Sequence, residues 1–356
     1  MTISANRTKE NPRILFLALS GIGNYIMQSP AIAAAKEKFP NSSIAVWVAP
    51  RGTKFLAEND PNVDSIIEMP IQTTAAQHVR QVLSLYKKKF DIGIVLSPGQ
   101  LVKSAAYLYL GGITRRIGAS YPFFNSPAST FLLTDTIEEE RSIHDIEQNL
   151  RLLGPLGISV HDNGYKINVS EQYRGEATAL LKGINLSPHQ MIIGLHAGSA
   201  PDLAFKRWPI ERFAEVAQAL IKDHKAHILL FGGPEEEGQK EQLRSLIRSS
   251  SVTSISSSLF TTAAVMQRCR LMIANDSGLM HLAAAAGVET LGLFGPTSEI
   301  ATGPRGKKSS IARAPGTKPI YRTEASANLE KQPHETILSL TVAMVTNRVN
   351  QILVSR

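Results

Sequence analysis

One short segment in the second half of the chain combines the groups that anion binding requires. It reads Asp276-Ser277-Gly278-Leu279-Met280-His281, one residue beyond the apolar run 271–274 and at the start of an alanine-rich helix that Gly287 should end. The first backbone N–H groups of such a helix, with its positive dipole end, can bind a diphosphate. A simpler interpretation is that Asp276 or Ser277 only caps the helix.

Two glycine-containing loops should lie at the same edge of a sheet. Gly295-Pro296-Thr297 follows the apolar run 290–294, and Gly232-Gly233-Pro234 follows the run 228–231. Glycine lets the backbone approach phosphate and ribose closely. Each loop alone is an ordinary turn after a strand, but together with the Asp276 segment they predict a nucleotide-binding edge.

Cations follow another apolar run, 191–195. His196-Ala197-Gly198-Ser199 comes first, and Lys206-Arg207-Trp208-Pro209 precedes a helix. Lys206 could neutralise the charge of a departing diphosphate. Alternatively, Lys206 and Arg207 are solvated loop cations and Trp208 belongs to the core.

Alternation of apolar runs with amphipathic stretches indicates the elements that position these residues. In the first half the runs are 14–19, 44–48, 65–69 and 91–96, and 75–89 is amphipathic; in the second half they are 191–195, 228–231, 271–274 and 290–294, with a helix at 211–224. This pattern predicts two α/β halves, each with a parallel sheet that receives ligands at the carboxyl ends of its strands.

The segments between these runs are predicted less regularly. We expect a loop at 121–134, a helix at 138–153, a domain boundary within 157–190, a surface connection at 249–258, and a basic stretch at 305–322 before a terminal helix. The terminal helix should bury Ile337, Leu340, Val345 and Val349.

Length, charge and cysteine content limit the class of protein. The 356 residues favour two domains, and 38 Lys+Arg against 30 Asp+Glu leave a net charge of +8, which favours an anionic partner. A single cysteine, Cys269, excludes an internal disulfide and a cysteine metal site. No signal-like segment and no run of about 18 apolar residues is found, so we expect a soluble protein, at most peripheral to a membrane.

The N-terminal turn Gly21-Ile22-Gly23-Asn24 is too short for a dinucleotide fingerprint. Together with Pro30-Ala31, the helix 144–153 and the motifs above, it nevertheless completes a pattern. The most specific part of that pattern is Asp276-Ser277-Gly278-x-x-His281-x-Ala283-x-Ala285-x-Gly287 followed by Leu293-Phe294-Gly295-Pro296-Thr297. In this order the motifs resemble the lipopolysaccharide heptosyltransferase family, glycosyltransferase family 9, over nearly the whole chain.

The resemblance implies a GT-B fold, with two Rossmann-like doubly wound domains facing across a cleft. It implies an N-terminal acceptor domain at 1–175, a C-terminal nucleotide-sugar domain at 176–335, and a terminal helix at 336–356 that crosses back to the N-terminal domain. The implied reaction is inverting transfer of a sugar, heptose from ADP-heptose, to a lipopolysaccharide-type or other bacterial glycan acceptor. No metal or other cofactor is implied.

The family's site residues carry over by position. Lys206 and the Ser277-Gly278 backbone would contact the donor diphosphate, Asp276 the donor sugar, and His281 the phosphate side. The implied donor set is His196, Gly198, Ser199, Lys206, Gly232, Gly233, Asp276, Ser277, Gly278, His281, Phe294, Gly295, Pro296 and Thr297. The implied acceptor set is Gly23, Asn24, Arg115, Arg116 and His144, and Asn24, Asp276 and Lys206 are the implied catalytic residues.

Asn24 departs from the family's pattern, in which an aspartate is the general base. A neutral amide cannot take up a proton. Three explanations are open: His144, Asp145 or His196 serves as the base; the acceptor nucleophile is already ionised; or the chain is a weak or inactive homologue that acts as a sugar-nucleotide-binding module.

Other expectations concern partners and location. Lys103, Arg115, Arg116 and the loop 121–125 would form an anionic acceptor surface, or are solvated surface charges. Nucleic acid is disfavoured as a partner, because Lys87-Lys88-Lys89 lies at a helix end, where cations favour the dipole. We expect a cytoplasmic protein, at most peripheral to the cytoplasmic face of the inner membrane; the donor base, acceptor and oligomeric state stay open.

Overall fold

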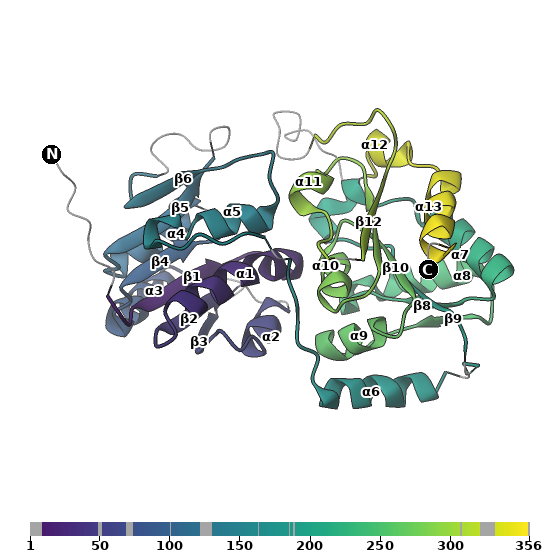
Figure 1. Ribbon diagram of the computed structural model, residues 1–356, viewed down its shortest axis with the longest axis horizontal. Coiled ribbons are helices and arrows are strands. Elements are labelled where there is room, and N and C mark those ends of the chain that lie inside the picture. The colour runs from purple at the N-terminus through teal and green to yellow at the C-terminus, as the bar shows by residue number, and fades with distance from the viewer. Residues whose placement is uncertain are drawn as a thin grey trace. The chain divides into compact units, whose positions relative to one another are not determined.

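The computed structural model describes residues 9–48, 52–68, 74–99, 101–121, 130–162, 164–184, 186–187, 189–306, 308–320 and 332–354. Its contacts divide the chain into two compact units, Met1–Gly164 and Tyr165–Arg356 (Figure 1). We call them the N-terminal and C-terminal units and describe each by itself.

The N-terminal unit contains a parallel six-stranded sheet in the order β3-β2-β1-β4-β5-β6. Its strands are β1 (Arg13–Ala18), β2 (Ser43–Val48), β3 (Ser65–Glu68), β4 (Ile92–Val95), β5 (Arg115–Ser120) and β6 (Asp135–Glu138). The central strands are almost wholly apolar because helices cover both faces of a parallel sheet.

The helices of this unit are α1 (Ile22–Lys38), α2 (Thr53–Glu58), α3 (Ala75–Lys88), α4 (Leu101–Leu110) and α5 (Asp145–Arg151), with a 3-10 turn η2 (Gly154–Leu156). Local sequence explains several of their ends. Thr74 and Gln77 form a reciprocal capping box at the start of α3. Gly21 begins α1 without a side-chain cap, and the first turn of α1 contains no acidic residue.

The C-terminal unit contains a second parallel six-stranded sheet, in the order β12-β11-β10-β7-β8-β9. Its strands are β7 (Ile192–His196), β8 (His227–Leu230), β9 (Val252–Ser254), β10 (Leu271–Asn275), β11 (Thr290–Phe294) and β12 (Ser309–Arg313). Its helices are α6 (Glu171–Lys182), α7 (Ile210–His224), α8 (Glu237–Ile247), α9 (Leu259–Met266), α10 (Gly278–Ala285), α11 (Glu299–Thr302), α12 (Glu335–Leu338) and α13 (Val342–Val354), with 3-10 turns η3 (Pro201–Lys206) and η4 (Pro234–Glu236).

The two sheets have the same topology. Read from β9, the C-terminal order matches that of the N-terminal sheet, with β7 and β10 in the places of β1 and β4. This is the strand order of a doubly wound Rossmann-like fold, which binds ligands where the order reverses. The predicted α/β architecture is confirmed, and the reversal points lie after β1 and β4 in one unit and after β7 and β10 in the other.

Four strands were not predicted, namely β5, β6, β9 and β12. All four mix polar with apolar residues. For β6, β9 and β12 the reason is that they are edge strands, which are less completely covered. The predicted helix 138–153 was too long: Glu138 ends β6, and the helix begins only at Asp145, where His144 caps it.

The structural division at Gly164/Tyr165 lies before the expected boundary at 175/176. Two contacts explain this, since Ile167 N–H donates to the Ala285 carbonyl and α6 packs against α9. The last helix, α13, buries Val345 and Val349 within the core of the C-terminal unit, against α7. The expected return of this helix to the N-terminal domain stays a prediction.

A buried hydrogen-bond network joins the loops at the reversal point of the N-terminal sheet. The Asn149 side chain accepts from Ser97 N–H at 2.8 Å and donates to the Ser97 carbonyl at 2.9 Å. Gln28, also buried, donates to the same carbonyl at 3.1 Å and to Ser20 Oγ at 3.4 Å. The ends of β1 and β4 are thereby fixed relative to α1 and α5.

We predict that Asn149→Ala destabilises the N-terminal unit by about 1–3 kcal/mol, because Ser97 N–H would be buried without its acceptor. Trp47 lies in β2 and Trp208 in the other unit. Denaturant unfolding followed by Trp47 fluorescence in a Trp208→Phe background therefore measures this unit alone. The exposed Asn59→Ala is the control, and equal stabilities of the two variants would contradict the role of Asn149.

Candidate functional site

The loops after β7 and β10 meet at the reversal point of the C-terminal sheet and are joined by Asn275, which is completely buried. Its Nδ2 donates to the Ala197 carbonyl at 2.6 Å, and its Oδ1 accepts from Trp208 N–H at 3.0 Å. One amide therefore fixes the loop 197–199, the segment before α7 and the start of the 276–278 loop.

A second network connects His196, Ser277 and Glu236. His196 Nε2 lies 3.2 Å from both carboxylate oxygens of Glu236, and Nδ1 lies 2.9 Å from Ser277 Oγ. Because a carboxylate only accepts, Nε2 carries a proton, and a neutral ring then accepts from the Ser277 hydroxyl at Nδ1. Ser277 also caps α10 by accepting from Met280 N–H at 3.3 Å, so the simpler capping interpretation holds for this residue.

Gly198 is required by the position of Glu236. A Cβ at Gly198 would overlap the Glu236 carboxylate and lie 3.0 Å from His196 Nε2. Gly233 N–H donates to Glu236 Oε2 at 2.8 Å, which brings the predicted Gly232-Gly233 loop into the same network. Burial alone would raise the pKa of Glu236, but the hydrogen bonds from His196 and Gly233 and the charge of Arg207 hold that pKa below its usual value.

Lys206 and Asp276 form a buried ion pair. Their Nζ and Oδ2 atoms are 3.3 Å apart, and both side chains are about nine-tenths buried or more. Lys206 is thus not the solvated loop cation of the alternative interpretation. Arg207 is also engaged, since it donates to Ser199 Oγ at 2.9 Å and to the Ser199 carbonyl at 2.6 Å. Trp208 is part of the core, as the alternative interpretation stated.

The loop after β11 is held by the elements around it. Phe294 is completely buried, and a Cβ at Gly295 would lie 2.5 Å from the backbone nitrogen of Ile337 in α12. Arg313 at the end of β12 donates to the carbonyls of Gly295 and Thr297 and pairs with Glu299 at 2.7 Å. Pro296 accepts from Ile320 N–H at 2.8 Å. Thr297 Oγ1 is buried with no hydrogen-bond partner among the described residues.

His281 lies on the buried side of α10. Its Nδ1 is 2.8 Å from the Tyr165 hydroxyl, which also accepts from Arg305 N–H at 3.2 Å. His281 therefore connects α10 to the segment that enters the C-terminal unit. Its expected contact with the donor phosphate stays a prediction.

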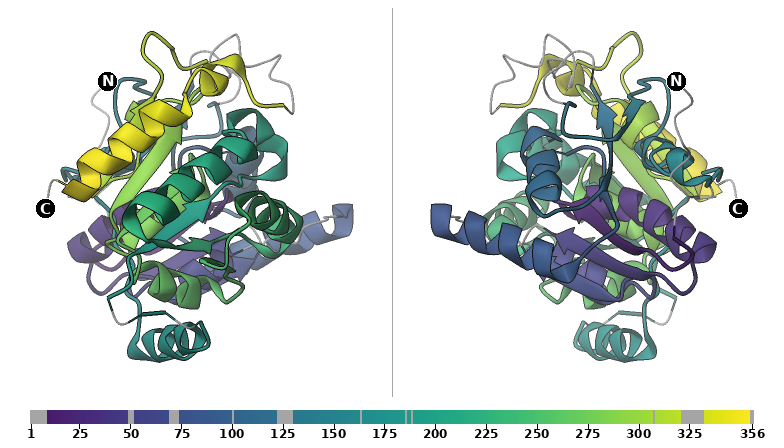
Figure 2. Two further views of the ribbon diagram at one scale, coloured as in Figure 1. Left: turned by 90° about the vertical axis from the view of Figure 1, so that its right-hand side faces the viewer. Right: turned by 90° about the vertical axis from the view of Figure 1, so that its left-hand side faces the viewer.

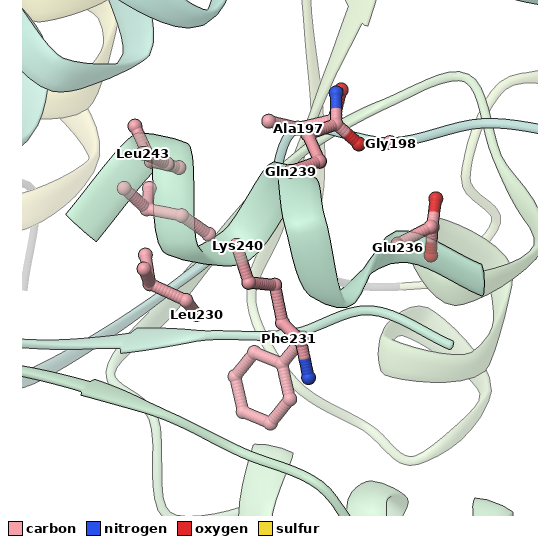
Figure 3. Close-up of a pocket in the computed structure, with 9 residues that line it drawn as sticks. Ala197, Gly198, Leu230, Phe231, Glu236, Gln239, Lys240 and Leu243 are labelled. Atoms are coloured by element: carbon pink, nitrogen blue, oxygen red, sulfur yellow. The ribbon is translucent and has the colours of Figure 1, made fainter. Parts of the chain in front are cut away.

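A small pocket lies beside these loops, between β7, β8 and α8 (Figure 3). Gly198 and Glu236 lie at one end, and Leu230 and Leu243 at the other. Lys240 reaches across it and donates to the Ile255 carbonyl at 2.8 Å. The pocket thus adjoins the Glu236 network and has an apolar inner wall.

In the N-terminal unit, Gly23 and Asn24 lie in the first turn of α1, at the carboxyl end of β1. Gly23 is buried and Asn24 is partly exposed. His144 is buried at the start of α5, where Nδ1 accepts from Ile146 N–H at 3.2 Å. That bond uses the basic nitrogen of a neutral ring, so His144 is poorly suited to remove a proton.

Arg115 and Arg116 are not brought together with Asn24. They begin β5, so they lie at the amino ends of the parallel strands, whereas Asn24 follows a carboxyl end. Arg115 pairs with Asp135 at 3.2 Å, and Arg116 donates to the carbonyls of Leu132 and Ile113. These contacts give both guanidinium groups a structural role.

Sequence reasoning missed Asn275, Glu236 and Arg313. Asn275 lies just beyond the predicted strand 271–274 and was not singled out, and the run Glu235-Glu236-Glu237 gave no sign of which carboxylate turns inward. Of the expected acceptor loop 121–125, Tyr121 donates to Ser97 Oγ at 2.8 Å, and 122–125 lie outside the described residues. Within the described ranges, no three His, Cys, Asp or Glu side chains form a group that could hold a metal ion.

We predict that Glu236 makes the stability of the C-terminal unit depend on pH. Because folding lowers the pKa of Glu236, its carboxylate stabilises the folded unit at pH values above its unfolded-state pKa, near 4.3. This stabilisation is lost as the pH falls through the lower, folded-state pKa. In a Trp47→Phe background, Trp208 fluorescence should show that Glu236→Gln reduces the loss of stability below pH 4.3. The exposed Glu241→Gln is the control, and parallel curves for wild type and Glu236→Gln would contradict this role.

Comparison with known proteins agrees with this architecture. Residues 79–331 match the family described as glycosyltransferase family 9 (heptosyltransferase). Lipopolysaccharide heptosyltransferase 2 of Escherichia coli K12 is 26% identical over 96% of this chain and 98% of its own.

Solved structures show the same fold. A family 9 glycosyl transferase from Veillonella parvula superposes with a TM-score of 0.82 at 22% identity, covering 99% of this chain and 100% of its own. Escherichia coli heptosyltransferase WaaC, solved with ADP-2-deoxy-2-fluoro heptose, gives 0.68 at 22% identity, covering 95% and 99%. The fold is of the GT-B type, as expected, and the chain is a glycosyltransferase that belongs to glycosyltransferase family 9, the heptosyltransferase family.

Proposed function

We propose that this protein transfers a sugar with inversion from a nucleoside diphosphate, specifically heptose from ADP-heptose, to an anionic glycan or glycolipid acceptor of the lipopolysaccharide type. The observation that carries the proposal is the buried Lys206–Asp276 ion pair beside the start of α10. A buried cation and a helix N-terminus at the reversal point of a Rossmann-like sheet suit a diphosphate.

The donor would use groups that the structure has already positioned. Lys206 and the backbone N–H groups of Ser277 and Gly278 would bind the diphosphate, and Asp276 would accept hydrogen bonds from the sugar. The Gly232-Gly233 and 294–297 loops would hold the nucleoside. The ligand of WaaC, ADP-2-deoxy-2-fluoro heptose, supports an adenosine diphosphate sugar.

In the proposed reaction, a bond forms between the acceptor oxygen and the anomeric carbon as the bond from that carbon to the diphosphate oxygen breaks. Lys206 and the α10 dipole stabilise the leaving diphosphate. Because these groups supply the positive charge, we propose that no metal is required. The acceptor would lie at the start of α1, whose own first turn contains no acidic residue that would repel an anionic group.

A base must remove the proton from the acceptor hydroxyl, and the Asn24 amide cannot be that base. His144 and His196, as neutral rings, already accept hydrogen bonds at their basic nitrogens. Of the three side chains considered as the base, only Asp145 therefore remains. The reaction would otherwise need an acceptor nucleophile that is already ionised. The same observation favours a second candidate function, a sugar-nucleotide-binding module without turnover.

We predict that Lys206→Ala weakens ADP binding about 10- to 150-fold, the value of one charge-assisted hydrogen bond to phosphate. Isothermal titration calorimetry in buffer with EDTA measures this loss and tests the metal independence at the same time. Lys206→Arg, which keeps the charge, should lose less.

Lys222→Ala removes an exposed cation from α7 in the same unit and serves as the control. If folded Lys206→Ala binds ADP as tightly as the wild type, Lys206 does not contact the diphosphate. Tight ADP binding without sugar transfer in the wild type would support the binding module.

We predict that Asn24 positions the acceptor, so that Asn24→Ala lowers turnover by less than the 10²- to 10⁴-fold typical of losing a general base. Asn24→Asp should raise the rate at neutral pH, because a carboxylate supplies a base for a hydroxyl acceptor. Turnover is measured at saturating donor and acceptor, with Asn59→Ala as the control. A lower rate in Asn24→Asp would indicate an ionised acceptor nucleophile, and two unchanged rates would place Asn24 outside the reacting centre.

A further inference from the structure

Two helices of the N-terminal unit expose large apolar side chains on their outer surfaces. On α3 these are Val79, Leu83 and Tyr86, at positions i, i+4 and i+7 of one helix face, each more than half exposed. On α4 they are Val102, Tyr109 and Leu110, each also more than half exposed. Exposed apolar residues usually occur singly, so a group of six on two helices indicates an interaction surface.

The two helices lie side by side. His78 of α3 hydrogen-bonds the Tyr107 hydroxyl of α4. Cβ atoms at Gly111 and Gly112, just after α4, would lie 2.8 Å from Leu85 and 2.9 Å from Tyr86. Leu85 and Tyr107 also share one core cluster. The exposed residues therefore lie on two adjacent helices, and Figure 2 shows α3, in blue, extending from the N-terminal unit.

The charged residues of these two helices are all of one sign. Neither 75–89 nor 101–110 contains an acidic residue, and the cations in these ranges are Arg80, Lys87, Lys88, Lys89 and Lys103. The carboxylates that follow along the chain are already paired, Asp91 with Lys9 and Asp135 with Arg115. We call these five cations and the six exposed apolar residues the α3–α4 face.

The helix dipole does not explain all of these cations. It favours Lys87 and its two neighbours at the end of α3, but Lys103 is the third residue of α4, where the dipole disfavours positive charge. Arg80 lies in the first half of α3. Cations in unfavourable positions beside exposed apolar residues point to an anionic partner.

Arg116 extends the apolar surface. Its guanidinium lies 5.4 Å from the centre of the Tyr109 ring, and its Nε donates to the Leu132 carbonyl at 2.5 Å. These contacts hold the segment that contains Phe131, whose side chain is 70% exposed, near the end of α4. Arg116, expected to bind an acceptor, thus helps to shape this surface.

We propose that the α3–α4 face docks the protein onto an anionic lipid bilayer. Val79, Leu83 and Tyr86 would enter the boundary between headgroups and acyl chains, while the cations contact lipid phosphates. Tyrosine and lysine suit this boundary, because each has an apolar body and a polar end. A second copy of the chain fits poorly, since a two-fold contact would place these cations against one another.

Docking through the α3–α4 face would bring the proposed acceptor position close to the bilayer, an inference that rests on the proposed function. α4 begins shortly after the carboxyl end of β4, so Val102 and Lys103 lie toward the edge of the sheet that carries Asn24. A lipid-linked acceptor in the same bilayer would reach this edge without leaving the membrane. Docking itself needs neither donor nor acceptor, so it can be tested separately.

The test is co-sedimentation of the purified full chain with vesicles, without any sugar nucleotide. At about 0.1 M salt, vesicles of phosphatidylcholine with phosphatidylglycerol should bind the chain, and vesicles of phosphatidylcholine alone should bind it far more weakly. Lys87→Gln/Lys88→Gln/Lys89→Gln should lower the partition coefficient about 100-fold, since each such cation contributes about five-fold. Val79→Ser/Leu83→Ser should lower it at least ten-fold.

Two variants in the C-terminal unit provide matched controls. Lys182→Gln/Lys222→Gln/Arg244→Gln removes three exposed charges, and Met344→Ser/Val354→Ser removes two exposed apolar side chains. Both should bind vesicles as the wild type does. Circular dichroism and thermal unfolding confirm that each variant is folded.

Three results would overturn the proposal. The first is that the wild type does not bind the anionic vesicles, and the second is that the control variants lose binding as much as the α3–α4 variants. The third is that the wild type forms dimers in sedimentation velocity runs without vesicles and Val79→Ser/Leu83→Ser does not, which would assign the face to a second copy. Calorimetry with ADP, run beside these measurements, separates a failure of docking from a failure of the proposed function.

Discussion

The structure around the candidate donor site depends on one buried amide, Asn275. Its side chain satisfies backbone groups of two segments distant in sequence, at Ala197 and Trp208, and so sets where the loops after β7 and β10 meet. A buried backbone group without a partner costs about 1–3 kcal/mol, so few other residues could occupy this position. In the N-terminal unit Asn149 performs the same task at Ser97. Both Rossmann-like sheets therefore use a buried amide to fix the point at which the strand order reverses.

The groups proposed to bind the donor also hold the site together. Ser277 caps α10 and hydrogen-bonds His196, and Glu236 connects His196 with the Gly233 backbone. Lys206 is paired with Asp276, so the site holds its positive charge next to a carboxylate before any ligand arrives. A diphosphate would compete with that carboxylate for the ammonium group. Binding and local stability are thus coupled, and variants at these positions need separate measurements of folding and affinity.

The sequence predicted what buried, apolar patterns determine. The central strands of both sheets and the expected convergence of three loops follow from uninterrupted apolar runs ending in glycine or polar residues, and α7 follows from its amphipathic spacing. Strands β6, β9 and β12 could not be recognised, because edge strands with exposed faces lack that pattern. The partners of charged side chains were equally hidden: whether Arg115 binds an acceptor or pairs with Asp135 depends on strand register. Motif resemblance supplied the donor residues that we propose, but it did not indicate Asn275, Glu236 or Arg313.

The central claim is that the carboxyl edge of the C-terminal sheet binds a nucleoside diphosphate. Hydrogen–deuterium exchange with and without saturating ADP tests it most directly, because backbone N–H groups that bind phosphate exchange more slowly. The account predicts slower exchange confined to 196–206, 232–236, 276–281 and 294–297. Slower exchange chiefly at 20–24 in the N-terminal unit, or unchanged exchange at saturating ADP, would contradict it.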